Sequence, residues 1–329
     1  MIFDNPETID SLTLPVFETD PPTGSLTSPG LMWYNAASGS IKFTINTTGS
    51  EVWVTGGAMI TARNGLAGAG TQNAGLAFGG STSVAVACTE AYNGSSWTAG
   101  GALITARQCL AGAGIQNATL AFGGVLTPSF AVTGCTEEYN GISWAAGGAL
   151  INTRFTLAGA GTQNAALAFG GDFNSLCTES YNGISWSNGG ALNRCRTALA
   201  GVGTQNAALA FGGCLATPSL VFNCTETYNG TSWSAGNAMN TGRYSLAGAG
   251  TQNAALAFGG NNGPLVSCTE VYNGTSWSVA NAMNVGKYWL AGTGTQNAAL
   301  AFGGCSLSSI LSCTEAYVTP YCIKTANFT

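Results

Sequence analysis

The sequence predicts an all-β protein, a six-bladed β-propeller preceded by an extended N-terminal arm. A Gly-rich unit of roughly 40 to 50 residues recurs along the chain, and a unit of this length built from short strands is typical of one four-stranded blade. Each copy has a Trp, a cation ten residues later and a Phe-Gly-Gly fifteen residues after the cation, followed by Cys-Thr-Glu and a Tyr. The copies are marked by Trp53, Trp97, Trp144, Trp186, Trp233 and Trp277.

Residues 246–277 show how one copy forms four strands. Residues 246–253, LAGAGTQN, alternate with a period of two and consist mostly of Ala and Gly, as an innermost strand requires where strands crowd around an axis. Residues 254–260 are the second expected strand, whose Gly doublet allows close backbone approach or a positive φ. Residues 268–272 are the third strand. Asn-Gly at 273 and 274 then makes a tight turn into the outermost strand, which carries Trp277.

The two ends of the repeat region complement each other. Five Tyr residues stand five positions before a Trp, but Tyr317 has no Trp after it and Trp53 has no Tyr before it. We therefore expect the strand that carries Trp53 to be the outer strand of the last blade, which removes an open sheet edge. A hairpin expected at residues 31–46 leaves a seventh, irregular blade as the alternative.

The chain divides into three expected segments. Residues 1–30 are polar and punctuated by Pro without a sustained period, and we expect them to form an extended arm. Residues 31–52 are expected to form a β-hairpin that leads into the closure strand. Residues 53–329 are expected to form the propeller.

Few residues of the chain are charged. Lys and Arg number 9 against 14 Asp and Glu, which gives a formal net charge of −5, and only 7% of residues are charged. This balance disfavours nucleic acid as a partner, because nucleic-acid binders carry a basic face or stripe. A surface of neutral polar groups suits neutral ligands or dense packing in an assembly, including one between copies of this chain.

The sequence shows no targeting segment. Its first residues, MIFDNPETID, contain no basic region followed by an apolar core, and no apolar run is long enough to span a bilayer. We therefore expect no signal peptide, no membrane insertion and synthesis in a reducing cytoplasm. The 11 Cys are then expected to be buried thiols. Two pairs that flank short loops, Cys214 with Cys224 and Cys305 with Cys313, are candidates for later oxidation.

With the cation, Phe-Gly-Gly, Tyr and Trp in this order, the repeat resembles the kelch motif from about residue 53 to 317. It departs from the usual kelch unit in a shorter turn between Tyr and Trp and in a fixed TQN turn. The resemblance implies a propeller that binds a partner or a ligand. Residues 33–53, with WYN, a Gly, IKF and a Trp in succession, also resemble short segments of bacteriophage tail-fibre and virion appendage proteins.

The enzymes that the resemblance suggests lack their residues here. Galactose oxidase has a related propeller, but its copper site needs imidazole ligands and this chain has no His. The YNGTSW turn is similar to the Asp box of sialidases but contains no Asp, and paired carboxylates suited to glycoside hydrolysis are not visible. The chain also has no CxxC pair, so we expect no metal site. Because the residues of these enzyme sites are missing, we also expect no catalytic residue and no cofactor.

The cations are the most regular electrostatic feature. Each precedes an inner strand, so that all are expected around one mouth of the central channel. A ring of this kind could bind an anionic sugar or a phosphate. A Glu recurs at the start of every third strand, on the same face by strand alternation, and we therefore favour one structural ion pair per blade. The cations are Arg63, Arg107, Arg154, Arg196, Arg243 and Lys287.

Recognition is expected where the repeat changes length. Every insertion falls between the Gly doublet and the Cys, on the face of the cations, and loops on a rigid scaffold are where binding tends to occur. The TQN and NGTS turns gather at the opposite face, either as good turns or as a docking ring for a symmetric partner. The longest loops, 126–134 and 214–223, carry apolar candidates for partner contact, with folding over neighbouring blades as the alternative. These candidates are Phe130, Leu220, Val221 and Phe222.

Together these features predict a non-enzymatic virion appendage protein of the tail-fibre, spike or capsid-surface type. Its propeller is expected to bind a host surface receptor, a glycan or a neighbouring protein, and its arm to attach it to other virion proteins. The segment at 33–53, the arm and the lack of an evident companion domain favour this function. The expected localisation is the virion, after synthesis in the host cytoplasm. The alternative is an intracellular kelch-type interaction adaptor, which usually carries a second recruitment domain.

Overall fold

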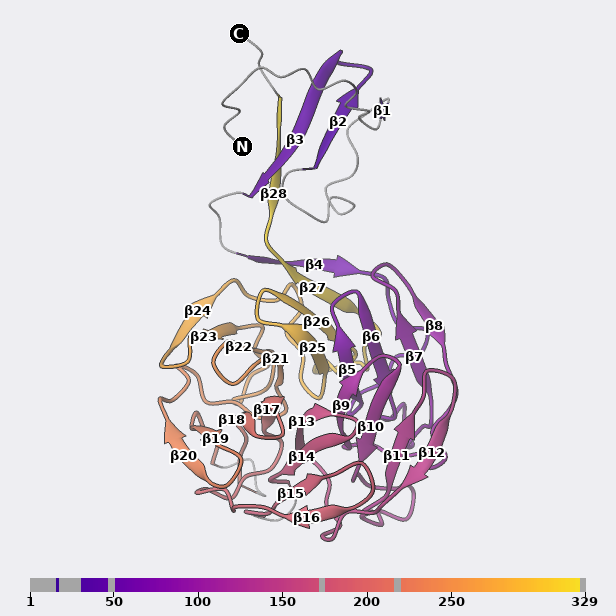
Figure 1. Cartoon of the computed structure of the whole chain (residues 1–329), viewed down its shortest axis with the longest axis vertical. Helices are drawn as coiled ribbons and strands as arrows, with labels where there is room; N and C mark the ends of the chain where they lie inside the picture. The colour runs from indigo at the N-terminus through magenta and orange to yellow at the C-terminus, as the bar shows by residue number, and fades with distance from the viewer. Residues whose placement is uncertain (1–15, 18–30, 47–50, 172–174, 216–219, 326–329) are drawn as a thin grey trace. The chain divides into compact units, whose positions relative to one another are not determined.

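The computed structural model describes residues 16–17, 31–46, 51–171, 175–215 and 220–325. Every regular secondary-structure element in these ranges is a β-strand. The described residues divide into two compact units, one within residues 51–318 and the other from the described parts of residues 1–50 and 319–329. The larger unit is a six-bladed β-propeller (Figure 1).

Each blade is a four-stranded antiparallel sheet whose strands follow one another from the centre of the wheel to its circumference (Figure 1). The inner strands are β5 (Ala67–Thr71), β9 (Ala111–Ile115), β13 (Ala158–Thr162), β17 (Ala200–Thr204), β21 (Ala247–Gly250) and β25 (Ala291–Thr295). The second strands are β6 (Ala74–Phe78), β10 (Ala118–Phe122), β14 (Ala165–Phe169), β18 (Ala207–Phe211), β22 (Ala255–Phe258) and β26 (Ala298–Phe302).

The third and outer strands complete the blades, which are numbered 1 to 6 from β5 onward. The third strands are β7 (Thr89–Tyr92), β11 (Thr136–Tyr139), β15 (Thr178–Tyr181), β19 (Thr225–Tyr228), β23 (Thr269–Tyr272) and β27 (Thr314–Val318). The outer strands are β8 (Trp97–Ala99), β12 (Trp144–Gly147), β16 (Trp186–Asn188), β20 (Trp233–Gly236), β24 (Trp277–Ala280) and, in blade 6, β4 (Val52–Gly56).

The inner strands need small residues, as the sequence predicted. A Cβ added at Gly68 would lie 2.6 Å from the ring of Phe302, so that the Phe of one blade fills the space left by a Gly of the next. The doublet Gly79 and Gly80 has φ values of 63° and 96°, and a Cβ at either position would lie 2.8 Å from a backbone oxygen. Only Gly combines this backbone conformation with this close approach.

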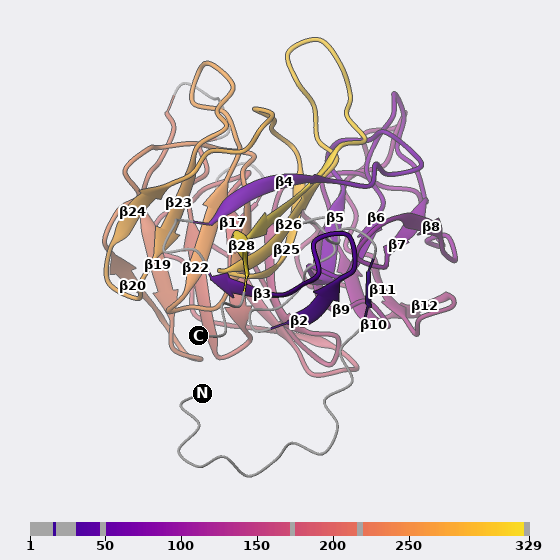
Figure 2. The same cartoon turned by 90° about the horizontal axis from the view of Figure 1, so that it is seen from above.

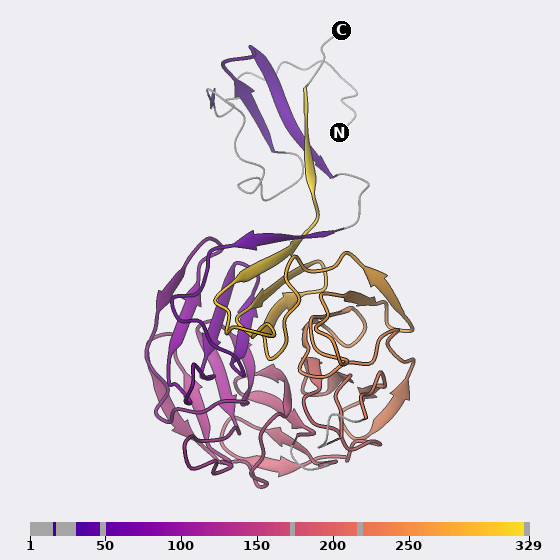
Figure 3. The same cartoon turned by 180° about the vertical axis from the view of Figure 1, so that it is seen from behind.

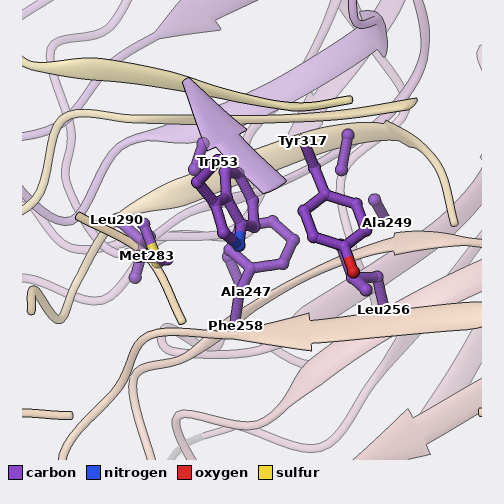
Figure 4. Packing of buried hydrophobic residues seen from close by; sticks show 10 residues of the cluster. Trp53, Ala247, Ala249, Leu256, Phe258, Met283, Leu290 and Tyr317 are labelled. Atoms are coloured by element: carbon purple, nitrogen blue, oxygen red, sulfur yellow. The ribbon is translucent and has the colours of Figure 1, made fainter. Parts of the chain in front are cut away.

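Each repeated Trp joins its blade to the preceding one. Trp53 in β4 packs edge-on against Phe258 in blade 5, with ring centroids 5.0 Å apart (Figure 4). Its indole N–H donates to the Thr269 hydroxyl at 2.9 Å. Tyr317, from the third strand of the same blade, also packs against the indole, at 5.1 Å. The other blades repeat the Trp–Phe and Trp–Thr contacts with the blade before them. The repeated aromatic residues are therefore the core between blades.

Blade 6 is completed by the first strand of the propeller. β4 pairs antiparallel with β27, which places Trp53 opposite Tyr317 and Val52 opposite Val318. The predicted closure is therefore confirmed, and the wheel has six blades. In the views from above and from behind, β4 lies against the yellow strands of blade 6 (Figures 2 and 3). The seven-bladed alternative is wrong, because the hairpin at 31–46 belongs to a separate sheet.

The smaller unit is a sheet built from both ends of the chain. Its strands, in spatial order, are β1 (Val16–Phe17), β2 (Met32–Asn35), β3 (Ser40–Asn46) and β28 (Tyr321–Thr325). Residues 16–17 of the expected arm pair parallel with β2, and the rest of residues 1–30 lies outside the described residues. The segment after Val318 had been assigned to the propeller, yet β28 pairs antiparallel with β3. Blade 6 already has its outer strand in β4, which leaves β28 free to pair elsewhere.

Candidate functional site

The repeated cations are buried and paired with Glu. Arg63 Nη2 lies 3.2 Å from Glu90 Oε1, and these side chains are 0% and 3% exposed. The ion pair expected in each blade is therefore confirmed, and the buried cations present no surface to an anionic ligand. The other pairs, with N–O distances of 3.0 to 3.3 Å, are Arg107 with Glu137, Arg154 with Glu179, Arg196 with Glu226, Arg243 with Glu270 and Lys287 with Glu315.

Each ion pair fixes the connection that enters its blade. The Glu90 carboxylate accepts a hydrogen bond of 2.7 Å from the backbone N–H of Ile60, in the segment between β4 and β5. Arg63 donates to the carbonyls of Cys88 at 2.7 Å and Ala77 at 3.2 Å. Burial lowers the pKa of the Arg63 guanidinium, and the charge of Glu90 opposes this shift. The pair is thus part of the fold of the blade.

The TQN turns also serve the contact between blades. Gln72, between β5 and β6, donates through Nε2 to the carbonyls of Ala299 at 3.0 Å and Tyr317 at 2.7 Å, both in blade 6. The equivalent Gln of every other blade reaches the second and third strands of the preceding blade in the same way. These amides are therefore committed within the propeller, which favours the interpretation of TQN as a structural turn.

The apolar candidates in the long loops differ in exposure. Phe130 is 72% exposed and has a left-handed φ of 53°, and Leu220 is 49% exposed. Val221 is half-buried. Phe222 is only 6% exposed, and the guanidinium carbon of Arg194 lies over its ring, 4.6 Å from the centroid. Phe222 is thus part of the packing, whereas Phe130 and Leu220 are accessible and their role in binding stays a prediction.

The variable loops begin beside the residues that follow the cations. Single β-bridges join the two segments: Asn64 with Ser81, Gln108 with Val125, Thr197 with Cys214, Tyr244 with Asn261 and Tyr288 with Cys305. Loops and cations therefore share one end of the propeller, as expected from strand alternation.

Two of these loops are flanked by the candidate Cys pairs. Both pairs carry free thiols; they are Cys214 with Cys224 and Cys305 with Cys313.

A closed ring of backbone hydrogen bonds lies at this end of the propeller. The second residue after each cation donates its N–H to the carbonyl of its counterpart in the preceding blade, over 2.7 to 3.0 Å. All of these residues have φ between 52° and 58°, a left-handed conformation that strains any residue except Gly. We call them the ring residues; they are Gly65, Cys109, Thr156, Ala198, Ser245 and Trp289.

The ring residues and the Leu that follows each of them line a hollow of ≈ 90 Å³. The ring residues and the residues immediately before them form what we call the axial mouth. In the sequence, these two positions lie between the cation and a constant Leu-Ala-Gly, and they read Asn-Gly, Gln-Cys, Phe-Thr, Thr-Ala, Tyr-Ser and Tyr-Trp in blades 1 to 6. Sequence reasoning missed them, although a variable pair inside a constant stretch was a usable signal.

One half of the axial mouth is aromatic. Tyr244, Tyr288 and Trp289 belong to blades 5 and 6 and are half-buried. A hydrogen bond with the Cys305 thiol, together with burial, raises the pKa of Tyr288. Tyr244 and Tyr288 each precede a ring residue, and these ring residues are joined by the hydrogen bond from the Trp289 N–H to the Ser245 carbonyl, at 3.0 Å. Ser245, beside them, is 5% exposed, and its hydroxyl has no hydrogen-bond partner. This half therefore combines apolar rings with an unsatisfied hydroxyl.

The axial mouth contains one thiol, that of Cys109. Burial raises the pKa of the Cys109 thiol to about 12, so this ring residue is protonated at neutral pH and is a poor nucleophile. Among the described residues, no group of three or more His, Cys, Asp or Glu side chains could hold a metal ion. In the same part of the chain, no helix has the length and apolar character needed to cross a membrane.

No known family model matches the chain, and no curated protein matches it. The likenesses to the kelch repeat and to phage appendage segments therefore stay predictions from the sequence. The fold itself, a closed propeller with variable loops at one end, suggests protein or ligand binding.

Proposed function

We propose that this protein is a non-enzymatic virion appendage protein whose propeller binds a host surface receptor, a glycan or a neighbouring protein. The observation that carries the proposal is the separation of the chain into a complete propeller and a small sheet made from both chain ends. Such an organisation suits a protein that is attached through one unit and recognises a partner through the other.

The terminal sheet supports the attachment role. The chain enters and leaves the propeller at two paired residues, Val52 and Val318, so the blades, the ion pairs and the closure are complete within residues 51–318. A sheet that the propeller does not need for its own closure is available to join other virion proteins. This sheet, rather than the N-terminal arm alone, is the proposed attachment unit.

The propeller supports the recognition role. Its repeated residues are occupied in contacts within and between blades, whereas its variable residues gather at one end, in the loops and the axial mouth. The exposed, left-handed Phe130 lies in one of these loops, and strained backbone is more frequent at binding sites than elsewhere. Variable groups on a rigid scaffold are a common arrangement for recognition.

The test is where the protein occurs in its source. Particles are purified on a density gradient and analysed by mass spectrometry, and the purified full chain is tested for saturable binding to host cells. Peptides from both units should appear in the particles in a constant ratio to other structural proteins, and the full chain should compete with particles for cells. Peptides found only in cytoplasmic complexes of the host would support the kelch-type adaptor instead.

A further inference from the structure

We infer that the axial mouth binds an uncharged saccharide, which packs against Trp289 and exchanges a hydrogen bond with Ser245. The inference rests on the proposed function for its biological setting, and it deepens that function by naming the ligand class and the residues. It is carried by the ring of left-handed residues, by the aromatic half of the mouth and by the unpartnered hydroxyl.

The ring residues keep side chains where the backbone favours Gly. The chain has 48 Gly, and in its described part every other left-handed residue except Phe130 is a Gly. Gly65 shows that the ring closes with Gly, yet the other blades place Cys, Thr, Ala, Ser and Trp there and accept the backbone strain. Side chains retained against such strain point to a role other than stability.

Trp289 supplies the apolar contact that a sugar ring requires. It lines the hollow and is half-buried, with Tyr288 and Tyr244 flanking it in blades 6 and 5. One face of a pyranose is made of C–H groups, which are apolar and weakly positive, and the face of an indole ring is electron-rich. The aromatic half of the mouth therefore matches the apolar face of a saccharide.

Ser245 supplies a hydrogen-bonding group that nothing in the described protein satisfies. Buried hydroxyls normally have partners, and the backbone groups of the ring are already bonded to one another. The Thr156 hydroxyl, in contrast, is bonded to Phe155 and to Thr197. The Ser245 oxygen is itself buried, so the ligand reaches it when the side chain rotates about its Cα–Cβ bond toward the hollow. A sugar hydroxyl both donates and accepts, and it can then hydrogen-bond with Ser245 in either direction.

The charge of the site selects an uncharged ligand. The hollow is lined by Gly, Leu, Cys, Thr, Ala, Ser and Trp, without an ionisable acid or base other than the protonated Cys109 thiol. The nearby cations are buried and paired with Glu. A carboxylate or phosphate would lose hydration without gaining a counter-ion. The hollow, of ≈ 90 Å³, offers room for one end of a saccharide chain.

The repeat itself provides variants that preserve the fold. Trp289→Gly reproduces the residue that blade 1 has at this ring position, and Ser245→Ala reproduces that of blade 4, Ala198. Because Gly is unstrained at a φ of 53°, Trp289→Gly should melt at the same temperature as the native chain or higher. Ile142→Thr, at an exposed turn where blade 4 has Thr231, is the control.

The experiment measures binding of the full chain to immobilised neutral oligosaccharides ending in glucose, galactose, mannose or N-acetylglucosamine, beside sulfated and sialylated forms. The native chain should bind at least one neutral saccharide saturably. Trp289→Gly should weaken this binding by roughly tenfold or more, and Ser245→Ala by roughly threefold to tenfold. Ile142→Thr should bind as the native chain does.

Three outcomes overturn the inference: no saturable binding of a neutral saccharide at millimolar concentration, binding of acidic saccharides alone, or neutral binding that Trp289→Gly leaves unchanged. The proposed function fails separately. If the full chain binds host cells and no neutral saccharide competes, only the saccharide site is wrong. If Trp289 controls saccharide binding but the chain is absent from particles, only the virion assignment is wrong.

Discussion

Two sets of residues within each repeat differ in how far they vary. The framework residues, which are the Trp, the cation, the Phe, the Glu and the Tyr, are the same in all six copies except that Lys287 replaces Arg in blade 6. The pair at the axial mouth, one and two residues after the cation, differs in every copy. The framework is buried within and between blades, whereas the ring residues of the axial mouth line a hollow.

The comparison shows what repetition constrains. A residue that contacts the next blade must suit an interface that occurs six times in the wheel, so the same side chain recurs. A residue beside the axis has no such requirement once its backbone has joined the ring. Changes to the framework should therefore lower stability and leave the specificity of binding intact, and changes to the mouth should do the reverse.

The largest effect is expected from loss of the closure strand. A chain of residues 60–318 lacks β4, which exposes the edge of β27 and removes the contacts of Trp53 with Phe258 and Thr269. This chain should unfold or polymerise, because a free edge templates pairing with other chains. Residues 51–318, which retain β4, are the control and should remain monomeric by light scattering. Equal stability of the two chains would rule out closure by β4.

The next largest effect is expected at a buried ion pair. Glu270→Ala leaves Arg243 buried without its acid and frees the backbone N–H of Asn240, which donates to Glu270 at 2.7 Å. Loss of one partner of a buried pair costs about 3 to 5 kcal/mol. Glu270→Gln, which keeps an acceptor for Asn240, should fall between this variant and the native chain in chemical denaturation. A loss below about 1 kcal/mol for Glu270→Ala, the range of exposed pairs, would contradict the structural role of the pair.

A moderate effect is expected at the contacts between neighbouring blades. Gln252→Ala removes two hydrogen bonds, to the carbonyls of Ala208 at 3.1 Å and Tyr228 at 2.6 Å. The expected loss of unfolding free energy is about 1 to 3 kcal/mol, because Ala208 is fully buried and its carbonyl would lose the hydrogen bond from the Gln252 amide. Thr251→Ala, at the exposed neighbouring position, should change the thermal midpoint little. Similar losses for both variants would assign the effect to the turn and not to the Gln amide.

The smallest effect is expected from restoring the framework in blade 6. The ammonium of Lys287 reaches Glu315 at 3.2 Å, but it has no counterpart of the carbonyl bonds that each Arg makes. Lys287→Arg should recover those bonds, to the carbonyls of Cys313 and Ala301, and stabilise the protein by about 1 kcal/mol. An unchanged or lower melting temperature would show that blade 6 is adapted to Lys.

Constant spacing explains why much of the fold could be predicted. A Trp without its Tyr at one end and a Tyr without its Trp at the other predicted the pairing of β4 with β27, because each blade needs both. The cation and the Glu, repeated at the same places, predicted the ion pairs through strand alternation. Both inferences used only features that every copy shares.

Features that occur once were beyond this reasoning. Among the described residues, Arg194 over the ring of Phe222 is the one contact of a cation with an aromatic face, and it follows from no repeated spacing. The pairing of β28 with β3 joins residues about 280 positions apart that belong to no repeat. The ring of left-handed residues does occur in every blade, but it depends on hydrogen bonds between blades, and the variable pair inside a constant stretch was its only sequence signal.

Exchange of the two long loops tests most directly whether recognition lies at the variable end of the propeller. Residues 126–134 and 214–223 are both replaced by DFNSL, the short loop of residues 172–176. Because the framework is untouched, the variant should stay folded, at a melting temperature lowered by the loss of the packing of Phe222 against Arg194. It should lose its binding to host cells or to its particle partner. A variant that stays folded and still binds both would show that recognition lies at the opposite end of the propeller or in the terminal sheet.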